Sequence, residues 1–440
     1  MLIFFSLRLE RKHTIPNIEI FKKQLLFWSQ QFNDVVWLDS NPDSYRNNQK
    51  FSNYDAVLAV DAFTSIQTDY HNAFDTLKEY QTLTNDWIFG YLSYDLKNDV
   101  EDLQSNNFDG LHFPDLYFFQ PKKLFLFKGN KVEIQYLNAV EDELEADLKL
   151  ICHCEAERRG NLSNDIKIKL RIHKDDYFEK LNKILAHIHR GDIYEANFCQ
   201  EFYAEDTQID PVETYQKLNN ISNPPFATFL KCHDNYVLSA SLERYLKKEG
   251  NTIISQPIKG TSKRSSNSVE DEKLKYELTK DEKERSENIM IVDLVRNDLS
   301  QTAIKGSVRV EELCEVYTFK QVYQMISTVV SKISNKIHPV DVIKTTFPMG
   351  SMTGAPKISA MKIIEALEET KRGVYSGAIG YFAPNGDFDF NVVIRSILYN
   401  ASQNYVSYSV GGAITSKSNP LSEYEECLIK AKAMREVLEN

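Results

Sequence analysis

One lysine and two pairs of glutamates are the residues of this chain whose types and spacing could do chemistry together. Lys259 stands in the run QPIKGT, residues 256–261, where proline and glycine predict a tight turn that exposes the side chain to a cleft. Within each glutamate pair the spacing is three residues, which places both side chains on one helix face. These glutamates are Glu284, Glu287, Glu423 and Glu426.

Carboxylates that face one another across a cleft repel unless a cation lies between them. Mg²⁺ suits that position because it accepts one or two protein carboxylates, keeps water and leaves room for a substrate oxygen. Taken singly, an acidic pair is more often a solvated helix face, and a lysine in a turn is more often only hydrated. Glu287 and Glu426 each stand close to an apolar stretch, and this favours a partly buried site.

A nucleophilic lysine must be neutral, and neutrality at pH 7 costs about 4–5 kcal/mol from the ordinary pKa. Burial or a neighbouring cation would lower the pKa of Lys259, and we expect one of these. Arg395 lies in the run VVIRSIL, residues 392–398, which predicts a buried strand. A buried arginine needs a partner that stabilises its charge. That partner would be either an acidic residue in a buried salt bridge or a substrate carboxylate bound through two hydrogen bonds. Gly411 and Gly412 follow an alternating strand, and their N–H groups could face an anion.

The composition excludes several classes of function. The chain has 440 residues, a net charge of −11 and 42% hydrophobic residues, which predicts a folded protein without general affinity for nucleic acid or anionic membranes. No apolar run is long enough for a membrane span, and the apolar N-terminus predicts a buried first strand rather than a signal peptide. The six scattered cysteines predict reduced thiols in the cytoplasm, and the spacing of Cys152 and Cys154 is too tight for a zinc knuckle.

Two segments, 1–150 and 165–440, are predicted on either side of a charged linker over 141–165. Short apolar strands alternate with polar turns in the first segment. In the second segment, a helix with apolar residues from Phe178 to Ile188 ends at Gly191, and a charged helix or loop runs over 270–288.

The strongest β pattern lies near the C-terminus. Strands over 374–384 and 387–398 flank the two-residue turn Asn385-Gly386, and a third strand covers 405–415. A last helix opens at Asn419-Pro420, and Thr353 is expected to cap the helix that follows it. Periodicity alone predicts only a mixture of α and β.

Several motifs in one order resemble the chorismate-utilising enzymes, the family of anthranilate synthase component I, aminodeoxychorismate synthase component I, isochorismate synthase and salicylate synthase. The motifs are ENIMIVDLVRND (287–298), GSMTGAPK (350–357), GAIGY (377–381), Ile394-Arg395 and the helix with Glu423 and Glu426. The resemblance covers roughly 165–440. It implies an α+β fold of two stacked antiparallel sheets surrounded by helices, like anthranilate synthase component I, with the cleft between them.

The resemblance also implies roles for the site residues. Glu287 and Glu426 would bind Mg²⁺ directly, with Glu284 and Glu423 acting through water. The metal would hold the ring carboxylate of chorismate. The remaining substrate contacts implied are Gly260, Thr261, Tyr381, Arg395, Gly411, Gly412 and Ala413, with Arg395 and Tyr381 on the enolpyruvyl carboxylate.

Two positions indicate the branch of the family. Anthranilate synthases have alanine at the position that Lys259 occupies. Lys259 instead resembles the lysine of aminodeoxychorismate synthase, which is proposed to attack C2 and expel the C4 hydroxyl. Ammonia then enters at C4. Enzymes that add water carry a different lysine, and that position falls near Glu195. A family histidine near the leaving pyruvate is Gln324 here, and glutamine cannot act as a general acid.

The source of nitrogen is expected to be another protein. No cysteine has the flanking glycines of a Gly-x-Cys-x-Gly glutaminase elbow, so ammonia would come from a separate class I glutamine amidotransferase subunit. The leading hypothesis is therefore aminodeoxychorismate synthase component I. Anthranilate synthase component I, an isochorismate synthase-type isomerase and a non-catalytic chorismate-binding subunit remain open alternatives, and so does a tryptophan ligand in the N-terminal segment.

Overall fold

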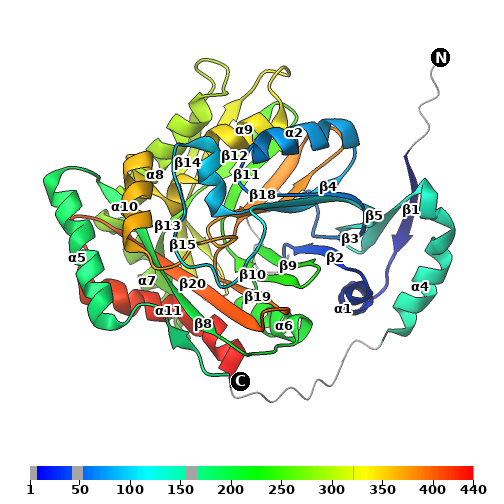
Figure 1. Ribbon diagram of the computed structural model, residues 1–440, viewed down its shortest axis with the longest axis horizontal. Helices are drawn as coiled ribbons and strands as arrows, with labels where there is room; N and C mark the ends of the chain where they lie inside the picture. Colours follow the sequence, from blue (N-terminus) through cyan, green and yellow to red (C-terminus); the bar gives the residue numbers. More distant parts are fainter. Residues whose placement is uncertain (1–6, 42–52, 155–165, 321, 440) are drawn as a thin grey trace.

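The computed structural model describes residues 7–41, 53–154, 166–320 and 322–439 (Figure 1). Most of the strand expected at the N-terminus lies outside these residues. The strands are β1 Arg8–Thr14, β2 Asp34–Asp39, β3 Ala56–Thr68, β4 Ile88–Leu92, β5 Leu116–Lys128, β6 Lys131–Leu137, β7 Lys169–Leu170, β8 Glu195–Ala204, β9 Phe226–Cys232, β10 Asn235–Ser241, β11 Arg244–Glu249, β12 Thr252–Gln256, β13 Ile258–Lys263, β14 Arg309–Thr318, β15 Val322–Lys332, β16 Gly354–Ala355, β17 Ala378–Phe382, β18 Phe388–Val392, β19 Ser396–Asn400 and β20 Tyr405–Ile414. The α-helices are α1 Ile18–Trp28, α2 Ala73–Thr84, α3 Lys97–Val100, α4 Leu144–His153, α5 Lys174–Arg190, α6 Pro211–Ser222, α7 Ser268–Lys280, α8 Glu282–Ser300, α9 Pro339–Thr346, α10 Lys357–Leu367 and α11 Pro420–Glu439.

The described strands form one connected antiparallel sheet with two arms that meet at β5. In the first arm the neighbours run β5, β3, β2, β9, β10, β19, β20 and β8. In the second arm they run β5, β4, β17, β18, β11, β12 and β15, and β15 also pairs with β13 and β14. The two expected sheets are therefore joined through a shared strand.

The two arms stack face to face across a common core. Val57, Leu230 and Leu398 of the first arm share one apolar cluster with Phe89 and Ile379 of the second. Helices α1, α6 and α11 contribute to the core on the other face of the first arm, and α2, α8 and α9 to that on the other face of the second (Figure 1). This arrangement confirms the α+β expectation, because each sheet face buries its apolar side chains against another layer.

The two predicted segments are interleaved in this sheet. Strand β2 pairs with β9, and β4 pairs with β17, so each arm contains strands from both segments. The expected linker is wrong in its first part, where α4 forms and buries Leu144, Asp147 and Ile151. Glu145 and Lys149 lie on the exposed face of this amphipathic helix, and composition alone does not distinguish such a helix from a linker. Residues 155–165 lie outside the described residues.

The C-terminal β pattern is confirmed in outline and corrected in one place. The turn at Asn385-Gly386 joins β17 to β18, with Gly386 at a φ of +77°. The strand expected over 387–398 is broken, because Arg395 adopts a φ of +53° between β18 and β19. This break moves the chain from the second arm, where β18 pairs with β11, to the first, where β19 pairs with β10.

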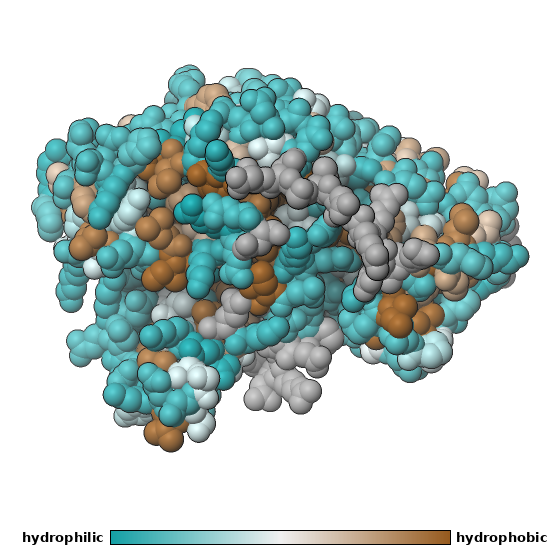
Figure 2. Space-filling view, turned by 90° about the horizontal axis from the view of Figure 1, so that it is seen from below, coloured by the Kyte–Doolittle hydropathy of each residue, from teal (hydrophilic) through white to brown (hydrophobic). Residues whose placement is uncertain are grey.

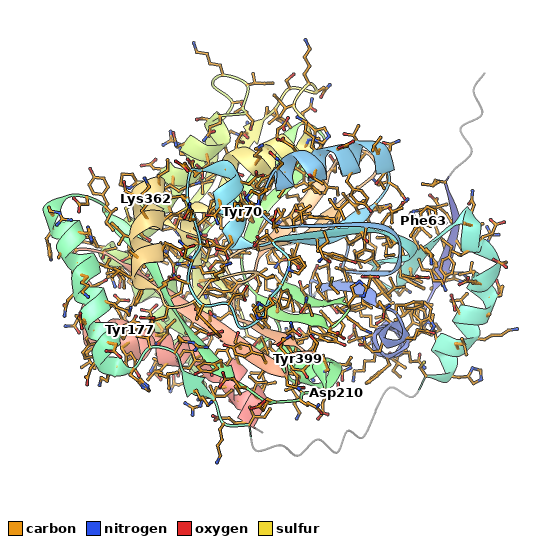
Figure 3. The ribbon with its side chains drawn as sticks, viewed as in Figure 1. Phe63, Tyr70, Tyr177, Asp210, Lys362 and Tyr399 are labelled. Atoms are coloured by element: carbon orange, nitrogen blue, oxygen red, sulfur yellow. The ribbon has the colours of Figure 1, made fainter. Side chains whose placement is uncertain are left out.

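Short-range sequence signals predict several of the observed helices correctly. Helix α5 ends at Gly191, whose φ of +88° provides the left-handed cap. Tyr177, labelled on α5 in Figure 3, has its ring centroid 5.3 Å from that of Tyr424 in α11. The charged stretch over 270–288 is helical in α7 and the start of α8. Thr353 is not the expected cap, because Pro356 precedes α10 and the Thr353 hydroxyl donates back to the Gly350 carbonyl.

Hydrophilic residues dominate the face shown in Figure 2, where hydrophobic residues gather only in small groups. Among the described helices, none combines the length and the apolar character that crossing a bilayer requires.

Candidate active site

A cleft of about 680 Å³ lies where the ends of the two arms come together. Strand β13 and helix α8 of the second arm contribute residues to it, as do β20 and α11 of the first. Its volume lies within the range of ligand-binding pockets. The predicted residues that line it are Lys259, Gly260, Thr261, Glu284, Glu287, Arg395, Gly411, Gly412, Ala413, Glu423 and Glu426.

Lys259 lies in strand β13 rather than in the expected turn. The pairing of β13 with β15 shifts register between Ile258 and Thr261, which marks a bulge. Gly260 within it has a φ of +98°, and a Cβ there would come 3.1 Å from Met325 and 3.3 Å from Glu284 Oε2. A larger residue would be both strained and crowded, so this glycine lets the strand bulge beside α8.

The Lys259 ammonium is held by carboxylates. Its side chain is 12% exposed, and Nζ lies 3.2 Å from Oε1 of Glu195, which belongs to β8. Burial by itself lowers the pKa of Lys259, but the charges of Glu195 and Glu287 outweigh it and raise the pKa above its ordinary value. The expected depression of this pKa is therefore not found, because the nearest groups are anions rather than cations.

The four glutamates meet in the cleft from two helices. Glu287 on α8 is buried, its Oε1 has no hydrogen-bond partner, and burial raises its pKa to about 7. Lys283 places Nζ 3.8 Å from Oε1 of Glu287 and 4.0 Å from Oε1 of Glu423 on α11. Although burial raises the pKa of Glu426, its ion pair with Lys430 at 2.7 Å prevails and lowers it.

The donor set suits Mg²⁺ in its chemistry, although the described residues contain no ready-made cluster of three metal-binding side chains. Hard carboxylate oxygens are present from both helices, and the buried Oε1 of Glu287 has no hydrogen-bond partner. Gly412 leaves open the space next to Glu423, because a Cβ there would lie 3.3 Å from Glu423 Oε2. Lysines 283 and 430 now neutralise three of the four carboxylates, and a metal would take over that charge.

Arg395 reaches the cleft from the crossover between the two arms. No described group hydrogen-bonds to its guanidinium or lies within ion-pair distance, and burial lowers its pKa against the opposing charges of Tyr375 and Glu426. A buried salt bridge, one of the two readings of this residue, is therefore not found. An unpaired buried guanidinium is costly unless an anion joins it, which makes Arg395 the natural partner of a substrate carboxylate.

Tyr381 is placed away from the cleft, and its assignment there is wrong. Its ring packs 5.5 Å from that of Trp87 in the core between the arms, and it lines a separate small cavity with Arg244 and Asp389. The tyrosine that lines the cleft beside Arg395 is Tyr375, which precedes β17. The sequence offers both tyrosines, but Tyr375 lies in the turn before β17, whereas Tyr381 stands on β17 and packs into the core between the arms.

Sequence reasoning also missed Glu243, a buried carboxyl at the cleft between β10 and β11. It is 3% exposed, accepts a hydrogen bond of 2.6 Å from the Ser351 hydroxyl, and burial raises its pKa to about 7. A carboxyl with such a pKa can donate or accept a proton near neutral pH. The signal was present in Ser241-Leu242-Glu243-Arg244, where a charged pair directly follows a buried strand.

The family profile described as chorismate binding enzyme matches residues 33–436. The chain belongs to this family. In sequence it is 38% identical over 265 residues to aminodeoxychorismate synthase component 1 of Salmonella typhimurium, across 60% of this chain and 58% of that protein. It is 32% identical over 391 residues to the Bacillus subtilis protein of the same name, across 84% of this chain and 81% of the relative.

A solved structure also supports the assignment of the chain to this family. Anthranilate synthase component I from Streptococcus pneumoniae superposes with a TM-score of 0.77 at 26% identity, covering 86% of this chain and 91% of that one. The chain thus spans little more than half of the Salmonella relative and most of the other two. These matches establish the family.

Proposed function

We propose that this protein is an Mg²⁺-dependent aminodeoxychorismate synthase component I, which converts chorismate and ammonia to 4-amino-4-deoxychorismate. The observation that carries the proposal is the amine of Lys259, buried in the same cleft as Arg395 and the four glutamates. The names of the Salmonella and Bacillus relatives support this branch. The product would be a precursor of p-aminobenzoate for folate synthesis.

Substrate binding would use both ends of the cleft. Arg395 and Tyr375 would take the enolpyruvyl carboxylate, while the backbone of Gly411, Gly412 and Ala413 would face the ring carboxylate. Mg²⁺ held by Glu287 and Glu426, with Glu284 and Glu423 through water, would neutralise that ring carboxylate. Because the chain is acidic overall, a dianion needs these local positive charges to bind.

The chemistry then requires an amine and an acid. Lys259 as a free amine would attack C2, the ring electrons would shift, and the C4–oxygen bond would break. Glu243 is placed to give the departing hydroxyl its proton, because its raised pKa keeps part of it protonated at neutral pH. Ammonia would then attack C4 and return the C2–nitrogen electron pair to Lys259. The enolpyruvyl group is retained throughout.

Ammonia would be delivered by a separate class I glutamine amidotransferase subunit. We expect the reaction to take place in the cytoplasm, where the six cysteines would stay reduced. Anthranilate synthase is the second candidate, because the Streptococcus structure superposes well. Lys259 and Gln324 count against it, and Glu195 in place of a water-activating lysine counts against the isochorismate reaction.

Product analysis tests the proposal. The protein is incubated with chorismate, Mg²⁺ and ammonium at mildly alkaline pH, with and without each component, and the products are separated by chromatography with mass detection. The expected product is 4-amino-4-deoxychorismate without pyruvate. Anthranilate with equimolar pyruvate would establish the second candidate, and isochorismate formed without ammonium would establish the isomerase. Binding of chorismate without turnover in any mixture would indicate a regulatory subunit.

A further inference from the structure

Glu195 stands out among the buried ionisable groups because the reaction described above gives it no role. It is 1% exposed at the start of β8, and its Oε1 lies 3.2 Å from the Lys259 amine. Its other oxygen, Oε2, is buried and has no hydrogen-bond partner. A buried carboxylate with one unsatisfied oxygen costs free energy and calls for an explanation.

The contact with Lys259 is built by long-range pairing of strands. Glu195 stands in register with Ala355 of β16, whereas Lys259 lies on β13 at the end of the other arm. The two side chains meet where the arms converge at the cleft. Neither forms an ion pair with a glutamate proposed to hold the metal, since the only ion pair of Lys259 within 4.0 Å among the described residues is with Glu195.

The proposed function needs Lys259 without its extra proton, and the surroundings hold that proton firmly. Five carboxylates act on the Lys259 charge: Glu195 from β8, Glu243 after β10, Glu284 and Glu287 from α8, and Glu426 from α11. Only Glu195 is within hydrogen-bonding distance. Among the residues that the structure describes, a proton leaving Nζ therefore has one direct acceptor, Glu195.

We propose that Glu195 is the base that takes the proton from the Lys259 ammonium in each turnover, so that the two side chains act as one nucleophile. This inference rests on the proposed function. One N–H bond of Lys259 breaks and an O–H bond forms on Glu195, which leaves a neutral amine beside a neutral carboxylic acid. The freed lone pair of Nζ makes the bond to C2.

The proton returns at the end of the cycle. When ammonia bonds to C4, the C2–nitrogen electron pair goes back to Nζ, and Lys259 regains the proton that Glu195 has held. Glu243, which gave its proton to the departing hydroxyl, recovers one from the new C4 ammonium. The sum is chorismate and ammonia giving 4-amino-4-deoxychorismate and water, with both glutamates and the lysine restored.

A purely electrostatic role for Glu195 predicts the opposite kinetic result. If its charge only held Lys259 in place, removing that charge would lower the pKa of Lys259 and free more amine at neutral pH. Amination would then be unchanged or faster. If Glu195 is the proton acceptor, by contrast, its loss slows amination, even though its negative charge favours the protonated form of Lys259. The variant Glu195→Gln separates the two, because the amide keeps the shape and can accept a hydrogen bond but cannot take a proton.

The experiment measures kcat and KM for chorismate from pH 6 to 9.5 with saturating Mg²⁺ and ammonium. We expect Glu195→Gln to lose about 100-fold or more in kcat at pH 7 with little change in KM. The ratio of variant to wild type, in which free ammonia cancels, should rise with pH as solvent takes over the proton. Glu195→Asp should recover part of the rate. A kcat at or above the wild-type value at pH 7 would overturn the proposal.

The matched control is Glu201→Gln on the same strand. Glu201 is also buried, pairs with Arg171 at 3.1 Å and does not line the cleft. Its variant should keep the wild-type shape of the pH profile. If both variants show the same altered profile, the effect comes from β8 and the proposal is wrong.

A second readout does not need turnover. The rate of acetylation of Lys259 by acetic anhydride, followed by peptide mass spectrometry across pH, reports its free amine. The midpoint should fall in Glu195→Gln and stay unchanged in Glu201→Gln. An unshifted midpoint would overturn the pairing. If wild type makes no 4-amino-4-deoxychorismate, the proposed function itself fails. If wild type makes it and Glu195→Gln keeps the wild-type kcat, only the inference about Glu195 fails.

Discussion

Thr261 and Gln324 are joined across β13 and β15 by a hydrogen bond in which the threonine hydroxyl donates to Oε1 at 2.9 Å. Gln324 is 3% exposed and lines the cleft, at the position where the family resemblance leads us to expect a histidine. The bond fixes the amide beside the place proposed for the substrate. If chorismate binds as proposed, a side chain that cannot donate a proton as an acid would stand near its enolpyruvyl group.

Gln324→His should therefore introduce release of pyruvate. An imidazole at this position can protonate or deprotonate the substrate, and acid–base groups typically contribute 10²–10⁴-fold to a rate. We expect the ratio of pyruvate to aminated product to rise about tenfold or more, measured by coupling pyruvate to lactate dehydrogenase. Thr261→Val is the control, because it breaks the hydrogen bond without adding an acid. Equal pyruvate from both variants would show that the acid is not the cause.

Lys259→Ala should abolish amination at C4. Loss of the nucleophile is expected to lower kcat about 1000-fold, equivalent to roughly 4 kcal/mol of transition-state stabilisation, with chorismate still bound through Arg395. Residual turnover would shift toward the C2 amination of an anthranilate synthase. Lys332→Ala, at an exposed lysine of β15, should keep the wild-type rate. A wild-type rate in Lys259→Ala would rule out the nucleophile, and product chromatography measures both outcomes.

Lys283→Met should strengthen Mg²⁺ binding. The Lys283 ammonium lies between Glu287 and Glu423, so a metal must displace it, and each such partly exposed contact contributes about 0.2–1 kcal/mol. We expect Kd for Mg²⁺ to fall about threefold, measured by isothermal titration calorimetry without substrate.

The control for this metal prediction is Lys273→Met, which removes an exposed lysine paired with Glu277 on α7 at 3.6 Å. It changes the net charge equally but should leave Kd unchanged. Weaker Mg²⁺ binding by Lys283→Met would mean that this lysine supports the metal site instead of competing for it.

The stability of the protein should depend on pH through Glu243. Burial raises its pKa from 4.5 to about 7, so the folded state holds this proton more tightly than the unfolded chain. Its contribution to stability is complete below pH 4.5 and is lost as the pH rises through 7. Glu243→Gln removes that dependence. Relative to wild type, we expect the variant to gain about 2 kcal/mol in the free energy of unfolding between pH 5 and 8.

Denaturant unfolding at several pH values measures that difference. Glu277→Gln, at an exposed carboxylate on α7, should show no comparable trend. A constant difference between Glu243→Gln and wild type across pH would show that the carboxyl is ionised throughout, and Glu243 could then not serve as the acid.

The sequence by itself determined the features that depend on neighbouring residues. Asn385-Gly386 specifies its turn, Gly191 ends α5, and the spacing within each glutamate pair puts both carboxylates on one helix face, because these effects act within one or two turns of chain. Together with the family motifs they identified the cleft residues and the α+β class. The run QPIKGT and the motif Ile394-Arg395 indicate Lys259 and Arg395 without any long-range information.

Only the tertiary structure decided the orientation of those side chains and the groups that they contact. The left-handed backbone of Arg395 occurs where the chain crosses between the arms. Tyr375 lines the cleft from the turn before β17, whereas Tyr381 on that strand packs into the core. Glu195 meets Lys259 through strands far apart in sequence. Burial and charge at such contacts set the pKa of each group, and these depend on long-range packing that no local pattern records.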